Sequence, residues 1–372
     1  MHTQSKFRLL VVRLGAMGDI LHALPAVTAL RQAHPTWTID WVVEPRWRAL
    51  LAADSAPEQQ ADLQPGTQSS PQLGPDPTPN AGSPLVTRLH LVSAKQWGKS
   101  PLRRKTLSEI KALRRELRAS NFDAVIDFQG AVRSAWIARM AGCPRLIGES
   151  TPREFLARWL YSEKVATPGV HVIEQDLELA SAVAGDDLVA VPPLLPVDQV
   201  ADAWAAQILP TGSPAVLINP GAGWGAKRWP AERYATVAVD LVAQGFRVVV
   251  NVGPGEEPLA DAIVQVTAGA AMPVKCSLGQ LIAITRLVTL CIAGDTGPLH
   301  LACALGRPVI GIYGPTDPSR NGPFGCNFKV LRSPDSRRDH ARRSETEAGL
   351  LTIQPADVLR AVHELLAEEN AR

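Results

Sequence analysis

Short apolar runs alternate with amphipathic stretches along the chain, and the pattern predicts strands and helices in turn. In the first half, apolar runs predict strands at 8–14, 38–43, 88–92, 123–128 and 145–148. Helical spacing of apolar positions predicts helices at about 18–33, 102–119, 132–141, 152–161 and 171–184. This alternation is typical of an α/β protein.

The alternation restarts after a proline-rich stretch, VAVPPLLPVD (189–198), which predicts a linker. Beyond it, strands are predicted at 215–219, 246–252, 273–276, 288–293, 308–313 and 328–331. Helices are predicted at 231–244, 257–268, 278–286, 297–305 and 355–369. Two such series predict two Rossmann-like domains facing across a cleft, over 1–188 and 199–354, with a final helical segment at 355–372.

Residues 54–86 interrupt the first series. They hold seven prolines and no apolar periodicity, which predicts an insertion without regular structure. The chain has 372 residues, too many for one ordinary core, which agrees with two domains.

Composition and charge narrow the class of protein. A formal net charge of +2 argues against a general nucleic-acid binder. The five cysteines form no CxxC pair and mostly lie in apolar surroundings, which predicts a reducing compartment and no zinc site. No apolar run approaches the roughly 20 residues that span a bilayer. Because Arg13 and Asp19 interrupt the first apolar stretch, we expect no secretory signal and a cytoplasmic protein.

The stretch from Lys6 to Leu30 predicts a strand, a small-residue loop (GAMGD) and a helix. Such a loop lies at the carboxyl edge of a parallel sheet, where α/β proteins bind ligands. Asp19 stands at the helix start beside glycines that leave the backbone open. A carboxylate there is a candidate catalytic group, and simple capping of the helix is the alternative.

A second candidate site is INPGAGWGAKRWP (218–230). The loop contains three glycines without side chains to cover its backbone amides: Gly221, Gly223 and Gly225. Lys227 follows two residues after the last of them. Bare amides plus a lysine suit phosphate oxygens, although a glycine turn with a surface lysine looks the same. The spacing is neither GxGxxG nor GxxxxGK[ST], which disfavours a standard dinucleotide site or a P-loop.

Two further strand ends carry polar residues. In CIAGDTGPLHLACALG (291–306), Asp295, Thr296 and Gly297 start a helix whose positive end suits a diphosphate. His300 follows one turn later and either contacts a ligand or packs beneath the loop. In VGPGEEPLADAI (252–263), a carboxylate at the helix start can accept hydrogen bonds from ribose hydroxyls.

The charge is concentrated between residues 95 and 118, which hold nine Lys or Arg and two Glu. One interpretation is a solvated helix face. The other is a surface for a polyanion, with Trp97 adding an apolar contact. The candidate binding residues at the start of this run are Lys99, Arg103, Arg104 and Lys105.

Three segments together resemble the glycosyltransferase family 9 heptosyltransferases, which build the inner core of lipopolysaccharide. They are RLGAMGDILHALPAVTAL (13–30), GAKRWP (225–230) and AGDTGPLHLACALGRPVIGIYGPTDP (293–318). DWVVEPRW (40–47), NFDAVIDFQGAVRSAWIAR (121–139) and REFLARWLYSEKV (153–165) point to the type I members. The resemblance covers almost the whole chain except 54–86, which is longer than expected. The loop before Lys227 is also more glycine-rich than the type I pattern.

The resemblance implies a GT-B fold in which the second domain holds a nucleotide-sugar and the last helix returns to the first domain. It implies that Asp19 is the general base and that Lys227 binds the donor phosphate. It further implies that Glu256 or Glu257 contacts ribose, and the one-residue gap leaves that choice open. The other implied donor-binding residues are Gly223, Asp295, Thr296, Gly297 and His300.

The implied reaction transfers L-glycero-D-manno-heptose from ADP-heptose to Kdo of Kdo2-lipid A, with inversion. It needs no metal or other cofactor and takes place at the inner face of the cytoplasmic membrane, where the basic run would face the phosphorylated acceptor. The alternatives are a type II or III heptosyltransferase, a Rossmann oxidoreductase, and a silent sugar-nucleotide-binding module. The missing GxGxxG disfavours the oxidoreductase, and the presence of both Asp19 and Lys227 disfavours the silent module.

Overall fold

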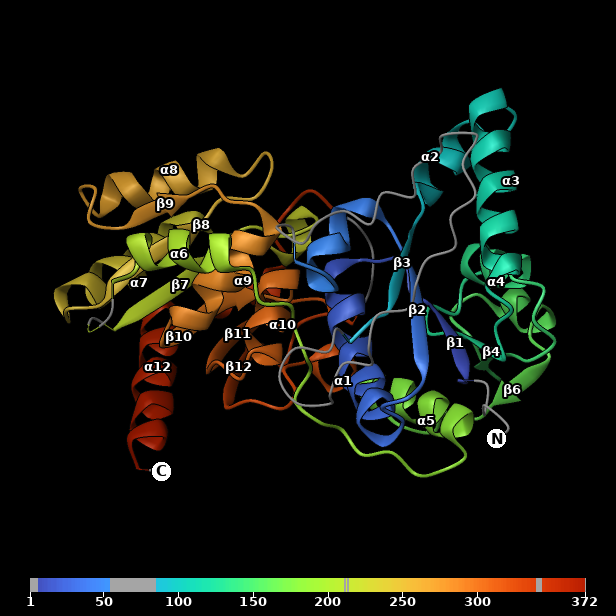
Figure 1. Cartoon of the computed structure of the whole chain (residues 1–372). Helices are drawn as coiled ribbons and strands as arrows, with labels where there is room; N and C mark the ends of the chain where they lie inside the picture. Colours follow the sequence, from blue (N-terminus) through green and yellow to red (C-terminus); the bar gives the residue numbers. More distant parts are fainter. Residues whose placement is uncertain (1–5, 54–84, 211, 213, 339–342, 372) are drawn as a thin grey trace.

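The computed structural model describes residues 6–53, 85–210, 212, 214–338 and 343–371. In this part of the chain, two six-stranded sheets lie side by side with helices packed around them (Figure 1). Every pairing between their strands is parallel. The predicted insertion at 54–86 falls outside the described residues except for Leu85 and Val86, which are buried.

The first domain contains a sheet with the strand order β3-β2-β1-β4-β5-β6. The central strand β1 is apolar and fully buried from Leu9 to Val12, because helices cover both faces of a parallel sheet. The strands are β1 Arg8–Val12, β2 Thr38–Val43, β3 Arg88–Leu91, β4 Ala124–Asp127, β5 Leu146–Glu149 and β6 Glu163–Val165. The helices are α1 Met17–Ala33, α2 Ala94–Lys99, α3 Arg104–Ala119, α4 Val132–Met140 and α5 Val172–Ala184, with 3-10 turns η1 Pro45–Leu50 and η2 Phe155–Trp159.

The second domain repeats this plan with the order β12-β11-β10-β7-β8-β9. Its strands are β7 Ala215–Asn219, β8 Arg247–Asn251, β9 Met272–Val274, β10 Leu290–Gly294, β11 Val309–Tyr313 and β12 Phe328–Arg332. Its helices are α6 Gln199–Ile208, α7 Ala231–Ala243, α8 Glu257–Val266, α9 Leu278–Leu287, α10 Gly297–Ala304, α11 Pro318–Asn321 and α12 Pro355–Asn370, with turns η3 Gly225–Lys227 and η4 Ala348–Thr352.

Each predicted strand coincides with an observed one, whereas the helix predicted at 152–161 is wrong. That segment forms only the turn η2. Ala157 and Tyr161 point inward, but Phe155, Leu156 and Trp159 are exposed, so no continuous apolar face holds a helix on the sheet. The pattern also missed β6, which has only three residues, and α6, which directly follows the proline-rich linker.

The two domains are joined by packing as well as by the linker. One apolar cluster contains buried side chains of both domains, among them Leu24 and Leu30 of α1 and Leu299 and Leu301 of α10. The linker lies against α1, where the Leu194 N–H donates to Thr28 Oγ1 at 3.1 Å. Helices α1 and α10 contact each other directly, and their starts meet at the boundary between the domains (Figure 1).

The last helix does not return to the first domain, which corrects the expectation for 355–372. The apolar face of α12, including Val358, Val362 and Leu365, is buried in a cluster with Val237 and Leu241 of α7. α12 also contacts β11 and β12, so it covers the second sheet (Figure 1). None of the helices in the described ranges is both long and apolar enough to span a bilayer.

Candidate active site

Asp19 lies in the first turn of α1, at the carboxyl end of β1. Its Oδ2 accepts a hydrogen bond from the Ala16 N–H at 2.8 Å, which makes it part of a capping arrangement. The side chain is still 39% exposed, so the carboxylate remains accessible while it caps the helix. The capping role and a catalytic role for Asp19 are therefore compatible.

Arg13 is a site residue that the sequence reasoning missed. Its Nη2 lies 3.6 Å from Asp19 Oδ1, and its Nε donates to the Asp19 carbonyl at 3.2 Å. The guanidinium is nearly buried and stays charged, so it fixes the position of Asp19 and adds positive charge beside it. The sequence did contain a signal for this role, because Arg13 is a charged residue directly after an apolar strand.

The second domain brings Lys227 and Asp295 together. Lys227 ends η3, and Asp295 directly follows β10; the Lys227 ammonium pairs with Asp295 Oδ2. The ammonium also lies 4.4 Å from the centre of the Trp224 ring. Both side chains are nearly buried, which orients the lysine along one direction. Gly223, in the preceding loop, faces open space: an added Cβ would meet no atom within 4 Å.

The Asp295 carboxyl is held in its ionised form. Burial by itself would raise its pKa, but the hydrogen bond from His300 and the charge of Lys227 outweigh burial and lower the pKa. The site therefore contains a buried anion that anchors the lysine through one oxygen and faces His300 through the other.

The start of α10 offers backbone amides beside this pair. Pro298 has no N–H, and the Leu299 N–H bonds to the Thr296 carbonyl, so the amides of Thr296 and Gly297 remain for a ligand. Thr296 Oγ1 accepts from Asn219 Nδ2 at 3.2 Å. Asn219 ends β7 and is a second residue that the sequence reasoning did not single out.

The structure separates the two candidate ribose ligands. Glu256 lies over the loop: its Oε2 accepts from the Gly253 N–H at 3.1 Å, and a Cβ at Gly221 would fall 1.9 Å from its carboxyl carbon. Burial raises the pKa of Glu256, opposed by the Gly253 hydrogen bond. Glu257 is exposed and pairs with Lys275 at 2.8 Å, which lowers its pKa. The position of Glu256 beside the glycine loop favours Glu256 over Glu257 as the candidate ribose ligand.

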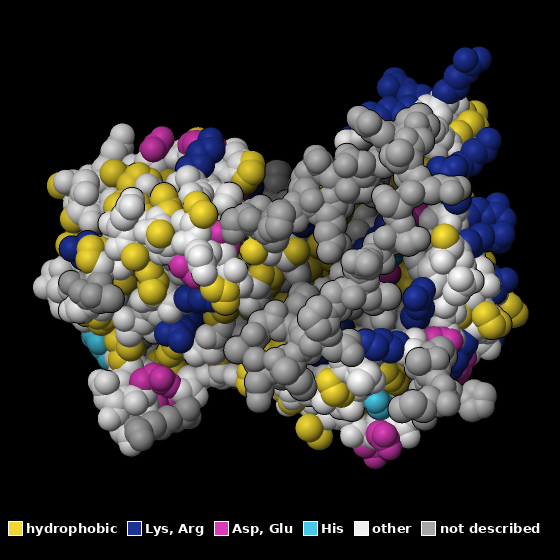
Figure 2. All heavy atoms as spheres, viewed as in Figure 1, with side chains coloured by type: hydrophobic (Ala, Val, Ile, Leu, Met, Phe, Trp, Pro, Cys, Tyr) yellow, Lys and Arg dark blue, Asp and Glu magenta, His cyan; other side chains and the backbone are white. Residues whose placement is uncertain are grey.

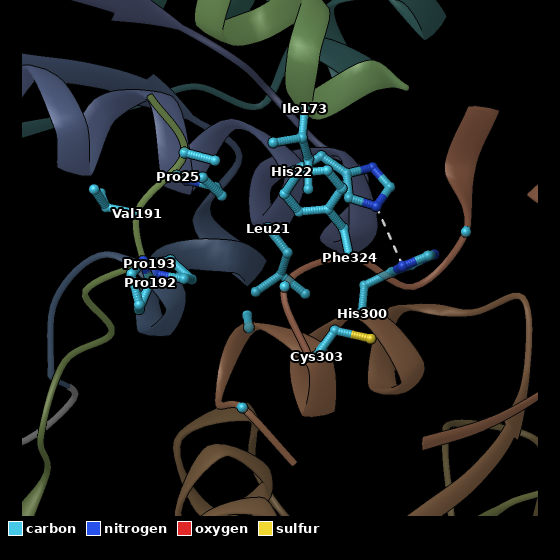
Figure 3. A pocket seen from close by; sticks show the side chains of 15 residues that line it. Leu21, His22, Pro25, Ile173, Val191, Pro192, Pro193, His300, Cys303 and Phe324 are labelled. Atoms are coloured by element: carbon cyan, nitrogen blue, oxygen red, sulfur yellow. Dashed lines mark hydrogen bonds between the residues drawn. The ribbon is translucent and has the colours of Figure 1, made fainter. Parts of the chain in front are cut away.

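His300 faces the first domain and helps to line a cavity at the domain boundary. Its Nε2 lies 3.2 Å from Asp295 Oδ1, and its Nδ1 lies 3.2 Å from Nε2 of His22 on α1 (Figure 3). The two helix starts approach closely, because a Cβ at Gly18 would lie 2.9 Å from the His300 ring. Similarly, a Cβ at Gly297 would lie 2.5 Å from the sulfur of Met17. The candidate groups of the two domains thus meet at the facing edges of their sheets.

The basic run forms α2 and α3, and its side chains gather over α3 in Figure 2. α2 and α3 follow β3 in the chain, so α3 begins on the side where the parallel strands end, which is also the side of Asp19. Trp97 is buried, and its Nε1 donates to Glu109 at 2.8 Å, so it packs α2 onto α3 and is not an exposed contact. The predicted acceptor residues, all exposed, are Lys99, Arg103, Arg104 and Lys105.

This arrangement suits transfer between an anionic donor and a hydroxyl. Asp19 on the first domain can accept a proton, and Lys227 with the α10 start on the second can bind a phosphate. Among the residues that the structure describes, no cluster of three His, Cys, Asp or Glu is placed to hold a metal ion.

Sequence comparisons identify related proteins for most of the chain. A model of glycosyltransferase family 9 (heptosyltransferase) matches residues 110–351. Lipopolysaccharide heptosyltransferase 1 of Escherichia coli K12 is 31% identical over 333 residues, 88% of this chain and 94% of that protein. The protein of the same name from Pseudomonas aeruginosa is 28% identical over 324 residues, 86% of this chain and 81% of its own.

Solved structures match the whole two-domain arrangement. The E. coli heptosyltransferase WaaC with ADP has a TM-score of 0.74 at 29% identity, covering 96% of this chain and 100% of that one. WaaC with ADP-2-deoxy-2-fluoro heptose gives 0.71 at 28% identity, covering 96% and 99%. The E. coli ADP-heptose lps heptosyltransferase II shares the fold, with 0.72 at 20% identity over 98% and 100%. These matches confirm the predicted GT-B fold.

Proposed function

Because the chain belongs to glycosyltransferase family 9, the heptosyltransferases, we propose that it transfers L-glycero-D-manno-heptose from ADP-heptose to a Kdo hydroxyl of Kdo2-lipid A. Similarity to type 1 relatives over most of their length supports this acceptor, and the nucleotides in the WaaC structures support the donor. The observation that carries the proposal is the close approach of two helix starts at the domain boundary: that of α1, which bears Asp19, and that of α10, which follows the Lys227–Asp295 pair.

The residue types account for each step of an inverting transfer. A sugar hydroxyl is a poor nucleophile, so Asp19 takes its proton as the new glycosidic bond forms at the anomeric carbon. The bond to the diphosphate breaks, and negative charge builds on the departing ADP. Lys227 and the amides of Thr296 and Gly297 stabilise that charge without a metal ion.

The basic start of α3 serves the acceptor in this proposal. Kdo2-lipid A carries phosphates and carboxylates, and Arg103, Arg104 and Lys105 are exposed on the side of the sheet where the strands end, the side of Asp19. Their charges attract a polyanionic acceptor and favour its capture.

We place the enzyme on the cytoplasmic face of the membrane that holds the acceptor. Exposed apolar side chains of η2 and α4 support this location: Leu156 is 67% exposed, Trp159 71% and Trp136 45%. The Arg158 guanidinium lies 4.9 Å from the Phe155 ring centre, so charge and aromatic surface are combined there. This combination suits the interface of an anionic bilayer.

Binding to vesicles tests the location. The parent protein should sediment with vesicles that contain phosphatidylglycerol, and the Leu156→Ser, Trp159→Ser variant should remain in the supernatant. Leu102→Ser, at an 85% exposed position outside η2 and α4, is the matched control. Equal sedimentation of all three proteins would assign membrane binding to another surface.

A related transferase with another acceptor is the second candidate. Lipooligosaccharide heptosyltransferase 2 of Haemophilus influenzae is 30% identical over 42% of this chain. We favour the type 1 acceptor because the type 1 relatives match twice that share of the chain.

One assay separates these candidates. The protein is incubated with ADP-heptose and either Kdo2-lipid A or its heptosylated product, and the acceptor mass is measured. The proposal expects Kdo2-lipid A to gain one heptose. A gain only on the heptosylated acceptor indicates a type II or III enzyme. Binding of ADP-heptose without any gain indicates a silent module, and NADH binding instead indicates an oxidoreductase.

A further inference from the structure

A chain of side-chain hydrogen bonds crosses from the first domain to the donor lysine. His22 lies on α1, one turn after Asp19, and its Nε2 is 3.2 Å from His300 Nδ1. His300 Nε2 is 3.2 Å from Asp295 Oδ1, and the other Asp295 oxygen pairs with the Lys227 ammonium. The chemistry proposed above assigns no role to His22.

The acceptor and donor properties of these groups fix the direction of the chain. An ionised carboxylate only accepts, so the His300 nitrogen that faces Asp295 carries hydrogen. With its ring hydrogen on Nε2 alone, His300 has an acceptor at Nδ1, and the hydrogen between the rings belongs to His22 Nε2. Burial, followed by the neighbouring His300, His171 and Arg13, lowers the pKa of His22 well below its usual value. A neutral His22 that donates from Nε2 therefore reinforces the His300 tautomer that Asp295 requires.

The surroundings hold the two rings together. Both histidines are only 6% exposed, and their ring centres are 4.4 Å apart with the planes at 69°. The close approach of Gly18 leaves the His300 ring no room to move toward α1. Both rings line a cavity of about 220 Å³, whose apolar lining includes Leu21, Pro25 and Phe324 (Figure 3). That lining offers the rings few other partners.

We propose that His22 is a positioning residue for the transfer reaction. By donating to His300 Nδ1, it reinforces the tautomer whose Nε2–H bonds to Asp295, and Asp295 in turn orients Lys227 toward the donor diphosphate. Asp19 and His22 both lie on α1. The binding of the donor diphosphate by Lys227 therefore depends on the correct packing of the helix that also carries the general base. The inference rests on the proposed role of Lys227 as a donor-phosphate ligand.

Two substitutions of His22 separate the hydrogen bond from packing. In His22→Gln, the amide nitrogen reaches the position of Nε2 and can donate, whereas His22→Leu fills the space without a donor. We expect His22→Leu to weaken ADP binding about 10-fold and to lower kcat by a similar factor, since a buried acceptor loses its partner. His22→Gln should stay within about 3-fold of the parent on both measures.

The tautomer of His300 is a readout that a purely structural role would not change. In ¹⁵N-histidine-labelled protein, the His300 ring shifts should indicate hydrogen on Nε2 in the parent and in His22→Gln. In His22→Leu they should show a mixture of tautomers. This measurement needs no donor, so it tests the chain even if the protein fails to bind ADP, a result that would overturn the proposed function instead.

His171 provides a matched control at the same boundary. Its ring centre is 5.7 Å from that of His22, but its Nε2 bonds to the Gly322 carbonyl at 3.1 Å and takes no part in the chain. His171→Leu should lower the melting temperature and leave ADP affinity within about 2-fold. The proposal is overturned if His22→Leu keeps parental ADP affinity and His300 shifts, if His22→Gln is as impaired as His22→Leu, or if His171→Leu weakens ADP binding equally.

Discussion

At the scale of single residues, Asp19→Asn isolates the loss of a proton acceptor. Asparagine keeps the size of the side chain and an oxygen that accepts from the Ala16 N–H, so the start of α1 should remain intact. We expect kcat to fall about 10²- to 10⁴-fold, the usual contribution of a general base. ADP affinity, measured by calorimetry, should stay unchanged. Near-parental kcat with ADP-heptose would show that another group takes the proton.

Lys227→Ala tests the donor side of the site. Removing a charge that contacts the diphosphate should weaken ADP binding about 10- to 100-fold and also slow transfer. Because the buried Asp295 loses its partner, a melting curve must accompany calorimetry. Unchanged affinity and kcat in a folded variant would contradict the assignment. Activity should survive EDTA; a loss that Mg²⁺ restores would show that a metal shares this role.

At the scale of elements, the first turn of α3 should act on the acceptor alone. Replacing Arg103, Arg104 and Lys105 with glutamine should raise the acceptor KM severalfold. The KM should also become less sensitive to salt, because the variant lacks the charge attraction that salt screens. The ADP-heptose KM should change little, since the donor residues lie on the other domain. Steady-state kinetics at two salt concentrations measures both constants.

The same helix supplies a control of equal charge. Lys111, Arg114 and Arg115 are exposed further along α3, away from the sheet edge that bears Asp19. Their replacement with glutamine should affect the acceptor KM much less. Equal effects of both triple variants on the acceptor KM would indicate that the total positive charge of α3 attracts the acceptor, and not its first turn. A change in the ADP-heptose KM alone would show that these residues serve the donor or form only a solvated helix face.

At the scale of the whole molecule, buried acids should make stability fall as the pH rises. Burial raises the pKa of Asp176 to about 8 and that of Asp127 to about 6, whereas an unfolded Asp titrates near pH 3.9. Between these values the folded chain keeps protons that the unfolded chain has lost. The contribution of Asp176 is therefore complete below about pH 4 and is lost as the pH rises to about 8, by at most about 1.4 kcal/mol per unit.

Urea unfolding at pH 5 and pH 8.5 checks this effect. Asp176→Asn keeps the shape of the neutral acid and removes the titration. The free energy of unfolding of the parent should fall between the two pH values by more than that of the variant. Parallel behaviour of the two proteins would mean that Asp176 is ionised in the folded state.

The alternation of apolar runs was sufficient to predict every strand of the two sheets except β6. Strands in parallel sheets are buried on both faces, so their apolar runs are readable without tertiary information. The carboxyl end of each strand followed from the order of elements, which located Asp19, Lys227 and Asp295 at sheet edges. Helix 152–161 failed because its apolar side chains face outward, a choice that local periodicity does not reveal.

What the sequence could not determine are the contacts between segments far apart in the chain. His22 and His300 are 278 positions apart, and only domain docking makes them neighbours. The packing of α12 against α7 depends on which surface the other helices leave uncovered. The different positions of Glu256 and Glu257 depend on where α8 begins, because Glu256 is its N-cap and bonds back to Gly253. The sequence thus determined the elements, their order and the residue types at the strand ends, because these follow from local periodicity and chain direction. Only the tertiary structure decided which of those residues meet, because burial and hydrogen bonding across the domain boundary depend on the packing of the whole chain.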